Sequence, residues 1–189
     1  YTWGWNHRRE PFNDVRVRRA MQFAINKQEI ADIALFGVAW PSRGWLPLWD
    51  PMYDPKDLGY DPLKAEELLT EAGYPNGFDG GTISTFTAGT LMPEAAVVVQ
   101  KQMADVGITF DIEVLEIGAY IDKLLTNYDF DCMIEWDIYF PTAGITLSIH
   151  LLTGAYGGKH TGLSDPEIDD VIDQLLQETD PKKQAVLSS

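Results

Sequence analysis

Four carboxylates stand at alternate positions around one predicted strand, and they are the residues best placed for chemistry in this chain. They are Asp129, Asp131, Glu135 and Asp137. Two carboxyl groups about 5–10 Å apart can cleave a glycosidic bond. The chain carries 29 acidic residues among 189, so such groupings arise by chance, and Asp131 is expected to hold a turn. A carbohydrate-active enzyme is therefore an alternative hypothesis and not the leading one.

The sequence predicts neither a metal site nor a cofactor. The three histidines, His7, His150 and His160, do not stand at ligand spacing to one another or to the single cysteine, Cys132. The sequence contains no phosphate-binding glycine loop and no nucleophile-elbow motif. Because Cys132 lies in an apolar run, we expect a small buried side chain.

Tryptophan is abundant, with six residues in the chain. Five of them fall at predicted strand ends or in a predicted loop: Trp3, Trp5, Trp45, Trp49 and Trp136. Such rings either pack in a core or form the wall of a pocket for a small organic ligand. Trp136 and Asp137 follow a predicted strand, and ligands of open α/β sheets bind beyond the strand ends. An aromatic wall beside a carboxylate suits a cationic or hydroxylated ligand.

Strands alternate with helices along the chain, which favours an α/β fold. We expect strands at 3–6, 82–86, 108–114 and 132–136. We expect helices at 15–25, 26–37, 62–72, 93–106 and 117–126, one after Ser164, and one from Asp180-Pro181. Asp14, Asn26, Asp61 and Ser164 are the expected N-caps, the last within an S-x-x-E capping box. We expect residues 38–60 to form a long aromatic-rich loop, and a loop of that length is usually either functional or wrongly assigned.

The charge is strongly negative, at −15. Residues 1–43 hold seven basic and four acidic residues, whereas 44–189 hold seven and 25. A field of that sign repels phosphate backbones, so nucleic acid is not an expected partner.

Four blocks of sequence follow one another in a specific order. They are PFNDVRVRRA at 11–20 with its flanks from Asn6 to Ile30, YDPLKAEELLTEAGY at 60–74, QMADVGI at 102–108 and YDFD at 128–131. These blocks resemble those of family 5 extracellular solute-binding proteins, the dipeptide- and oligopeptide-type receptors of bacterial ABC importers. The resemblance covers much of the chain.

The resemblance implies one lobe of a type II periplasmic-binding-protein-like fold, with a mixed sheet flanked by helices. Residues 1–189 would be a single C-terminal lobe and residues 1–6 its hinge strand, with the N-terminal lobe and the last return crossing outside the chain. The partners implied are a peptide or other small solute, the missing lobe and ABC permease subunits. The implied location is the periplasm, or the cell surface as a membrane-anchored lipoprotein, and no enzymatic activity is implied.

The resemblance also implies a ligand site near residue 137, in one of two registers. Counted back from Pro141, Asp137 takes the position of the acid that pairs with the ligand's α-amine. Counted forward from Trp136, Tyr139 takes that position and the carboxylate is absent. Some dipeptide binders hold the ligand carboxylate with an Arg in the loop after the strand 82–86, but residues 87–93 contain no Arg or Lys.

The leading hypothesis is a solute-binding lobe without catalysis. The predicted ligand-binding residues are Asp137, Trp136, Tyr139, Trp5, Asn6, Thr87 and Thr90. The alternatives are the carbohydrate-active enzyme and a module that docks another protein through the aromatic loop 38–60.

Overall fold

The structure, a computed structural model, describes residues 1–42, 46, 58–87, 90–136, 139–140 and 142–187. The chain forms two compact units. Unit 1 comprises Tyr1–Pro41 and Leu58–Trp136, and unit 2 comprises Ser42–Asp57 and Asp137–Ser189. The single lobe over 1–189 stays a prediction. Among the described residues, no helix has both the length and the apolar character needed to cross a membrane.

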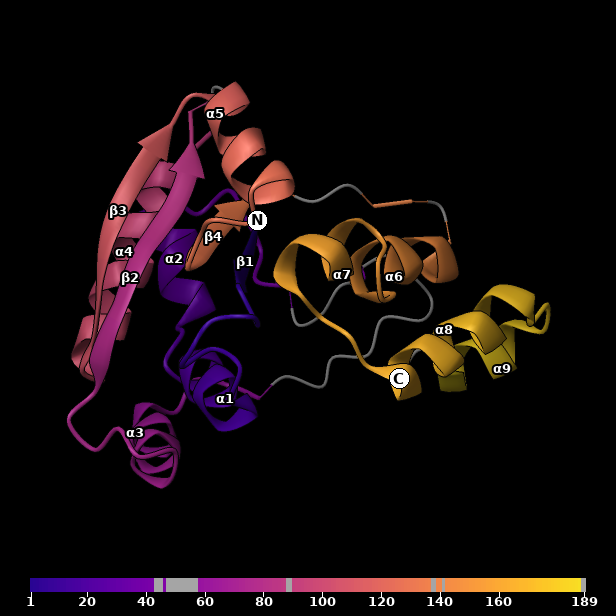
Figure 1. Cartoon of the computed structure of the whole chain (residues 1–189), viewed down its shortest axis with the longest axis horizontal. Coiled ribbons are helices and arrows are strands. Elements are labelled where there is room, and N and C mark those ends of the chain that lie inside the picture. Colours follow the sequence, from indigo (N-terminus) through magenta and orange to yellow (C-terminus); the bar gives the residue numbers. More distant parts are fainter. Residues whose placement is uncertain (43–45, 47–57, 88–89, 137–138, 141, 188–189) are drawn as a thin grey trace. The chain divides into compact units, whose positions relative to one another are not determined.

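Unit 1 is built on a mixed sheet, as the resemblance implies (Figure 1). Its strands within the described residues are β1 (Thr2–Trp5), β2 (Phe78–Phe86), β3 (Ile108–Leu115) and β4 (Cys132–Glu135), in the order β1-β4-β2-β3. Strand β2 runs parallel to β3 and β4, whereas β1 runs antiparallel to β4. The expected hinge strand therefore lies at an edge of the sheet.

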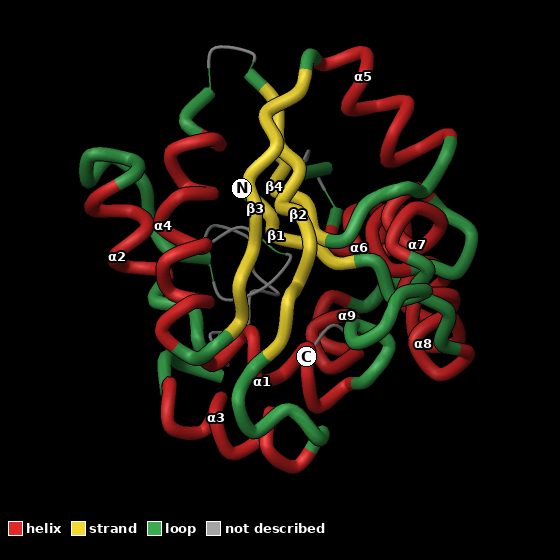
Figure 2. Tube along the Cα trace, turned by 60° about the vertical axis from the view of Figure 1, so that its left-hand side comes forward, coloured by secondary structure: helices red, strands yellow, loops and turns green. Residues whose placement is uncertain are grey.

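Helices cover both faces of this sheet (Figure 2). Helix α4 (Met92–Asp105) lies on one face with α2 (Lys27–Ile33) against it. Helix α5 (Ile117–Ile121), continued by the π-helical turn η1 (Asp122–Thr126), lies on the other face. Helices α1 (Val15–Phe23) and α3 (Pro62–Glu71) pack against each other beyond one end of the sheet. The open sheet thus has connections on both faces.

The helix starts in unit 1 follow from local capping chemistry. The side chains of Asp14, Asn26 and Asp61 accept hydrogen bonds from the backbone N–H groups of Arg16, Glu29 and Lys64. Each cap satisfies a donor that would otherwise have no intrahelical partner. These three predicted caps are confirmed.

Strand β2 begins earlier than predicted, at Phe78 and not at Thr82. The pairing of β2 with β3 shifts between Asp79 and Thr82, where Gly81 has a φ of +76°. A bulge of this kind needs a residue that accepts left-handed backbone, so the glycines belong to the strand and do not mark its boundary.

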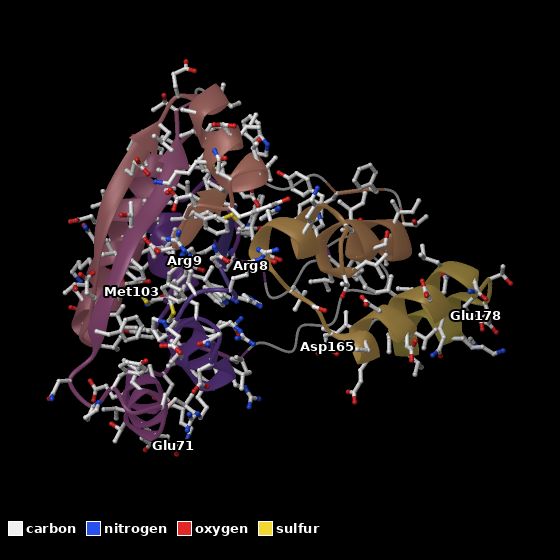
Figure 3. The ribbon with its side chains drawn as sticks, viewed as in Figure 1. Arg8, Arg9, Glu71, Met103, Asp165 and Glu178 are labelled. Carbon is white, nitrogen blue, oxygen red and sulfur yellow. The ribbon has the colours of Figure 1, made fainter. Side chains whose placement is uncertain are left out.

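The core of unit 1 lies between the sheet and its helices and contains fully buried side chains such as Met103 (Figure 3) and Cys132. Burial raises the pKa of the Cys132 thiol well above its ordinary value. The thiol is therefore protonated and behaves as a small apolar side chain. The expected burial of Cys132 is confirmed.

Unit 2 is helical in its described part. It contains α6 (Ala143–Leu151), α7 (Tyr156–Thr161), α8 (Pro166–Gln177) and α9 (Pro181–Leu187). Asp165, labelled at the start of α8 in Figure 3, accepts from the N–H groups of Glu167 and Ile168. The expected Ser164 cap is wrong by one residue, because Pro166 takes the first helical position and Asp165 precedes it. Helices α6 and α7 are not among the helices expected from the sequence.

The described part of the loop 38–60 is irregular and includes the strongly exposed Trp40, with 81% of its surface accessible. Most of the loop, including Trp45 and Trp49, lies outside the described residues. Its docking role stays a prediction.

Candidate ligand-binding site

The strand pairing brings four residues into one row just beyond the sheet. Phe86 at the end of β2 is paired with Leu115 of β3, and Thr2 of β1 is paired with Glu135 at the end of β4. Ser84 of β2 is paired with Met133 of β4, and two residues further along these parallel strands Phe86 lies level with Glu135. The row that follows these ends is Glu116, Thr87, Trp136 and Tyr1, and all four residues are exposed. We call these four residues the strand-end row.

Trp136 and Tyr1 have large exposed rings, with 43% and 54% of their surfaces accessible. The Trp136 ring stands edge-on to Phe86, with the centroids 5.0 Å apart. Phe86 is buried and packs in turn against Tyr120 of α5, at 4.6 Å. Edge-to-face contacts of this kind fix ring orientation. The Trp136 ring is thus held in place from one side and left accessible on the other.

Tyr1 is anchored at the start of α4. Its hydroxyl accepts a hydrogen bond from the backbone N–H of Leu91, at 3.1 Å. Leu91 is the N-cap residue of α4 and provides no side-chain cap. The Tyr1 hydroxyl therefore links β1 to the connection that leaves β2.

The connections from the neighbouring strands β2 and β3 leave toward opposite faces of the sheet. Residues after β2 enter α4 on one face, and residues after β3 enter α5 on the other (Figure 2). Such divergence opens a crevice at the carboxyl ends of parallel strands, where open α/β sheets bind ligands. Thr87 and Glu116 of the strand-end row begin these two connections.

The predicted ligand residues divide into three groups. Trp136 and Thr87 lie in the strand-end row. Thr90 lies in the same β2–α4 connection, and its buried Oγ1 has no hydrogen-bond partner among the described residues. Trp5 and Asn6 lie at the other end of β1, beside Cys132 and Asp131. Tyr139 belongs to unit 2 and is exposed, whereas Asp137 lies outside the described residues. The ligand role of all seven residues stays a prediction.

Two members of the strand-end row, Tyr1 and Glu116, were not among the predicted site residues. Each directly flanks a strand, Tyr1 before β1 and Glu116 after β3. The beginning of β1 lies among the ends of parallel strands because β1 runs antiparallel to β4. Strand direction is set by pairing between distant segments, so the local pattern around Tyr1 carries no signal of it.

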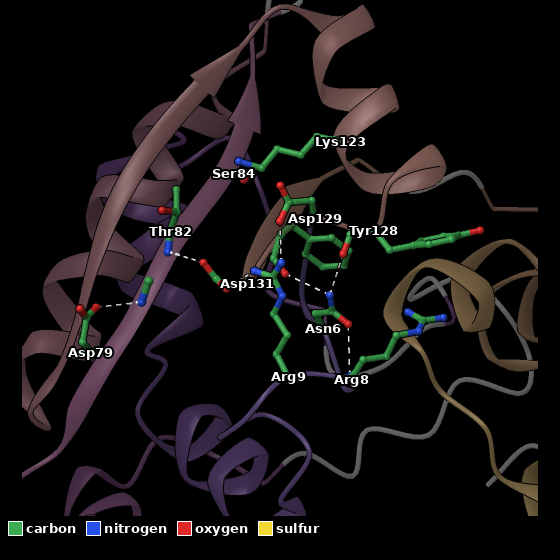
Figure 4. A network of polar contacts seen from close by, with 12 residues as sticks. Asn6, Arg8, Arg9, Asp79, Thr82, Ser84, Lys123, Tyr128, Asp129 and Asp131 are labelled. Carbon is green, nitrogen blue, oxygen red and sulfur yellow. Dashed lines mark hydrogen bonds and ion pairs between the residues drawn. The ribbon is translucent and has the colours of Figure 1, made fainter.

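Asp129 and Asp131, two of the four carboxylates considered for glycoside cleavage, are engaged in ion pairs within the fold. The Arg9 guanidinium binds Asp131 and Asp129, each at 2.6 Å (Figure 4). The second oxygen of Asp131 accepts from the backbone N–H of Thr82, at 3.1 Å. The two carboxylates raise the pKa of Arg9, with the Asp131 hydrogen bond as the largest cause. Asp131 thus holds a turn against β2, as predicted.

Asn6 is buried, and its amide is engaged with backbone groups. Its Nδ2 donates to the carbonyls of Tyr128 and Phe130, both at 3.1 Å, and its Oδ1 accepts from the N–H of Arg8. These contacts satisfy the side chain within the fold (Figure 4). The residue therefore ties the end of β1 to the turn that precedes β4.

His7 has its pKa lowered from 6.5 to about 4 by burial, with further lowering by Arg18 and Arg8. Since the pKa in the unfolded chain is higher, the unfolded state takes up the proton first as pH falls from about 6.5 to 4. The contribution of His7 to stability should be complete above pH 6.5 and decrease toward pH 4. The contribution of His7 to the free energy of unfolding is at most about 3 kcal/mol. Solvent screening reduces this contribution, because the ring is only partly buried.

Urea unfolding of His7→Gln and the parent chain at pH 7.5 and 4.5 measures this effect. The variant should lose less stability between the two pH values, because it lacks the imidazole that takes up a proton on unfolding. The carboxylates titrate in both proteins, so their contribution cancels in the comparison. An equal loss in both would contradict the role given to His7.

In the described part of the chain, no group of three or more His, Cys, Asp or Glu side chains is placed to hold a metal ion.

Comparison with known proteins defines the class. Residues 1–157 match the family model for bacterial extracellular solute-binding proteins, family 5 middle region. The chain belongs to family 5 of the bacterial extracellular solute-binding proteins. Its fold, a mixed sheet flanked by helices, is that of periplasmic binding proteins, and the relatives and structural neighbours described below are binding proteins.

Among characterised relatives, the glutathione-binding protein GsiB of Pectobacterium atrosepticum is 37% identical over 116 residues, and that of Escherichia coli is 36% identical. The match covers 60% of this chain and 22% of each relative. The matched region is thus about a fifth of the length of these relatives.

Among solved structures, DppA of Helicobacter pylori in complex with the peptide STSA is 27% identical, with a TM-score of 0.84, over 98% of this chain and 37% of that one. A dipeptide-binding protein from Pseudoalteromonas in complex with Met-Leu also gives 0.84, at 24% identity, over 98% and 38%. The second similarity establishes the fold alone.

Proposed function

We propose that this chain is part of a solute-binding protein that captures a peptide or another small organic solute and delivers it to the permease of an ABC importer. The observation that carries the proposal is the strand-end row, where exposed aromatic and polar side chains gather beyond the ends of parallel strands in a chain of this family. Its partners would be the solute, the permease subunits and an N-terminal lobe of the same protein. The location would be periplasmic or, as a lipoprotein, extracellular.

Trp136 would form the apolar wall of the site, with Tyr1 beside it in the row. The Trp136 ring packs against Phe86 and would lose little rotamer freedom when a ligand covers it. The entropic cost of ordering this side chain on binding would therefore be small, which favours affinity. Such a wall selects for shape and apolar area and accepts a range of side chains. No bond needs to be made or broken in this role, which accords with a binding protein and not an enzyme.

The charges of the row favour a ligand that carries a cationic amine. Glu116 is exposed in the row, and residues 87–93 provide no Arg or Lys. Asp137, which follows Trp136 in sequence, would supply a charge-assisted hydrogen bond worth about 1.5–3 kcal/mol. Peptides carry such an amine at their N-terminus. Glutathione is the first solute to test because the GsiB relatives are named for it.

Calorimetric titration of the complete polypeptide with glutathione, and then with the dipeptide Met-Leu, tests the proposal. We expect Trp136→Ala to weaken binding at least tenfold, because an aromatic anchor in a ligand site contributes more than about 1.4 kcal/mol. Trp40→Ala is the matched control, since it removes another exposed tryptophan of unit 1 that is not in the row. Loss of binding in Trp40→Ala with full binding in Trp136→Ala would contradict the proposal.

A further inference from the structure

The turn before β4 is tied to the segment after β1 by one polar cluster, which we call the Arg9 clamp (Figure 4). It consists of Arg9, Asp129, Asp131 and the backbone N–H of Thr82. We infer that the Arg9 clamp is a positioning device that sets the register of β4 against β1 and β2, and thereby places Trp136 and Tyr1 in the strand-end row. The consequence for ligand rests on the proposed function, whereas the consequence for register does not.

The strands themselves specify this register weakly. Strand β4 has four residues, Cys132 to Glu135, and all four are buried. A strand buried on both faces lacks the alternation of apolar and polar residues that penalises a one-residue slip. Its pairing with β2 consists of Ile83 with Cys132 and Ser84 with Met133. Some other interaction must therefore select one register.

The clamp supplies that selection because it holds the residue directly before β4 from two directions. The Asp131 carboxylate binds Arg9 through one oxygen and the N–H of Thr82 in β2 through the other. The Asp131 carbonyl accepts from the N–H of Asn6, at 2.9 Å. A slip of one residue would offer Phe130 or Cys132 in its place, and neither side chain can make these bonds. Asp131 thus fixes β4 to both neighbouring strands at once.

Gly81 permits the approach of Asp131 to β2. A Cβ built on Gly81 would lie 2.3 Å from the Asp131 carboxylate oxygen. Because no side chain fits at position 81, the bulge of β2 and the Asp131 carboxylate are complementary in shape. The N–H of Gly81 itself donates to Asp79, at 2.9 Å, which holds the bulge in form.

The effect of the clamp reaches the opposite end of β4. A strand advances about 3.3 Å per residue, and successive side chains point to opposite faces. A slip by one residue would therefore carry Trp136 off Phe86 and turn its ring to the other face of the sheet. The pairing of Thr2 with Glu135 would shift as well, and with it the place of Tyr1 beside Trp136. Arg9 and Asp131 are positioning residues in this sense, because they act through Trp136 and Tyr1.

The test is nuclear magnetic resonance of the full chain, with Asp131→Asn and Arg9→Met as the disrupting variants. Asp131→Asn retains an acceptor for Thr82 but presents an amide to Arg9. We expect the cross-strand contact of Gly4 with Met133 and the ring contact of Phe86 with Trp136 to be lost or shifted. The contact of Ile83 with Ile112, between β2 and β3, should persist. Arg9→Lys should restore part of the parent pattern, because an ammonium still reaches Asp131.

Lys64→Met is the matched control, since it removes the cation of an exposed ion pair on α3 and should leave every one of these contacts unchanged. If Arg9→Met fails to fold, Asp131→Asn, which preserves size and the Thr82 bond, gives the result. Asp129→Asn should have a smaller effect than Asp131→Asn, because the Asp129 side chain is 73% exposed and that of Asp131 is 26% exposed. An unchanged register in Asp131→Asn with only lowered stability would overturn the inference.

Titration of the same variants with glutathione separates this inference from the proposed function. A register shift together with at least tenfold weaker glutathione binding supports both. If the parent protein binds neither glutathione nor Met-Leu while the register still shifts, the clamp stands and the proposed ligand class fails.

Discussion

Gly77→Ala is expected to lower the free energy of unfolding by about 2–5 kcal/mol. Gly77 has a φ of +74°, which costs a residue with a Cβ about 1–2 kcal/mol. A Cβ at this position would also lie 1.8 Å from the carbonyl oxygen of Gly107, and overpacking adds about 1–3 kcal/mol. That carbonyl accepts the N–H of Phe78 at the start of β2, so the clash would also displace this bond.

Gly73→Ala is the matched control for this prediction. Gly73 also has a positive φ, +97°, but a Cβ there meets nothing within 4 Å. Gly73→Ala should lower the free energy of unfolding by about 1–2 kcal/mol, the cost of the left-handed backbone conformation alone. Urea unfolding of both variants measures the difference, which reports the steric contact alone. Equal losses in the two variants would contradict the predicted clash of an alanine Cβ at position 77 with Gly107.

Asn6→Ala is expected to lower the free energy of unfolding by about 2–4 kcal/mol. The variant leaves the carbonyls of Tyr128 and Phe130 without the Asn6 donor, in a place where the Asn6 side chain is buried. Each buried polar group that loses its partner costs about 1–3 kcal/mol. Thermal or urea unfolding of the full chain measures the loss.

Asn13→Ala provides the comparison, because Asn13 is exposed on the surface and should change stability by less than about 0.5 kcal/mol. The experiment also separates two roles for Asn6. A stable Asn6→Ala protein with impaired ligand binding would favour the ligand contact predicted from the sequence. An unstable protein would favour the structural role that the hydrogen bonds describe.

The sequence by itself determined the features that depend on nearby residues. Asp14, Asn26 and Asp61 cap helices because a side-chain oxygen reaches an N–H two or three residues further along the chain. The alternation of strands with helices indicated the α/β class, and the ordered blocks of residues indicated the family. The burial of Cys132 followed from its apolar neighbours. At the start of α8 the capping-box pattern indicated Ser164, but Pro166 takes the first helical position and Asp165 is the cap.

Only the tertiary structure decided which residues stand together at the candidate site. Tyr1 and Trp136 are 135 positions apart, and they become neighbours because β1 pairs antiparallel with β4 in one register. Asn6 was predicted from the sequence to bind ligand, and that role stays a prediction; only the tertiary structure shows that its amide donates to the carbonyls of Tyr128 and Phe130, in the turn before β4. Strand pairing and burial are contacts between distant segments, and neither capping nor periodicity encodes them. Local sequence therefore determines the elements and the family, whereas the pairing of β1, β2 and β4 determines the strand-end row.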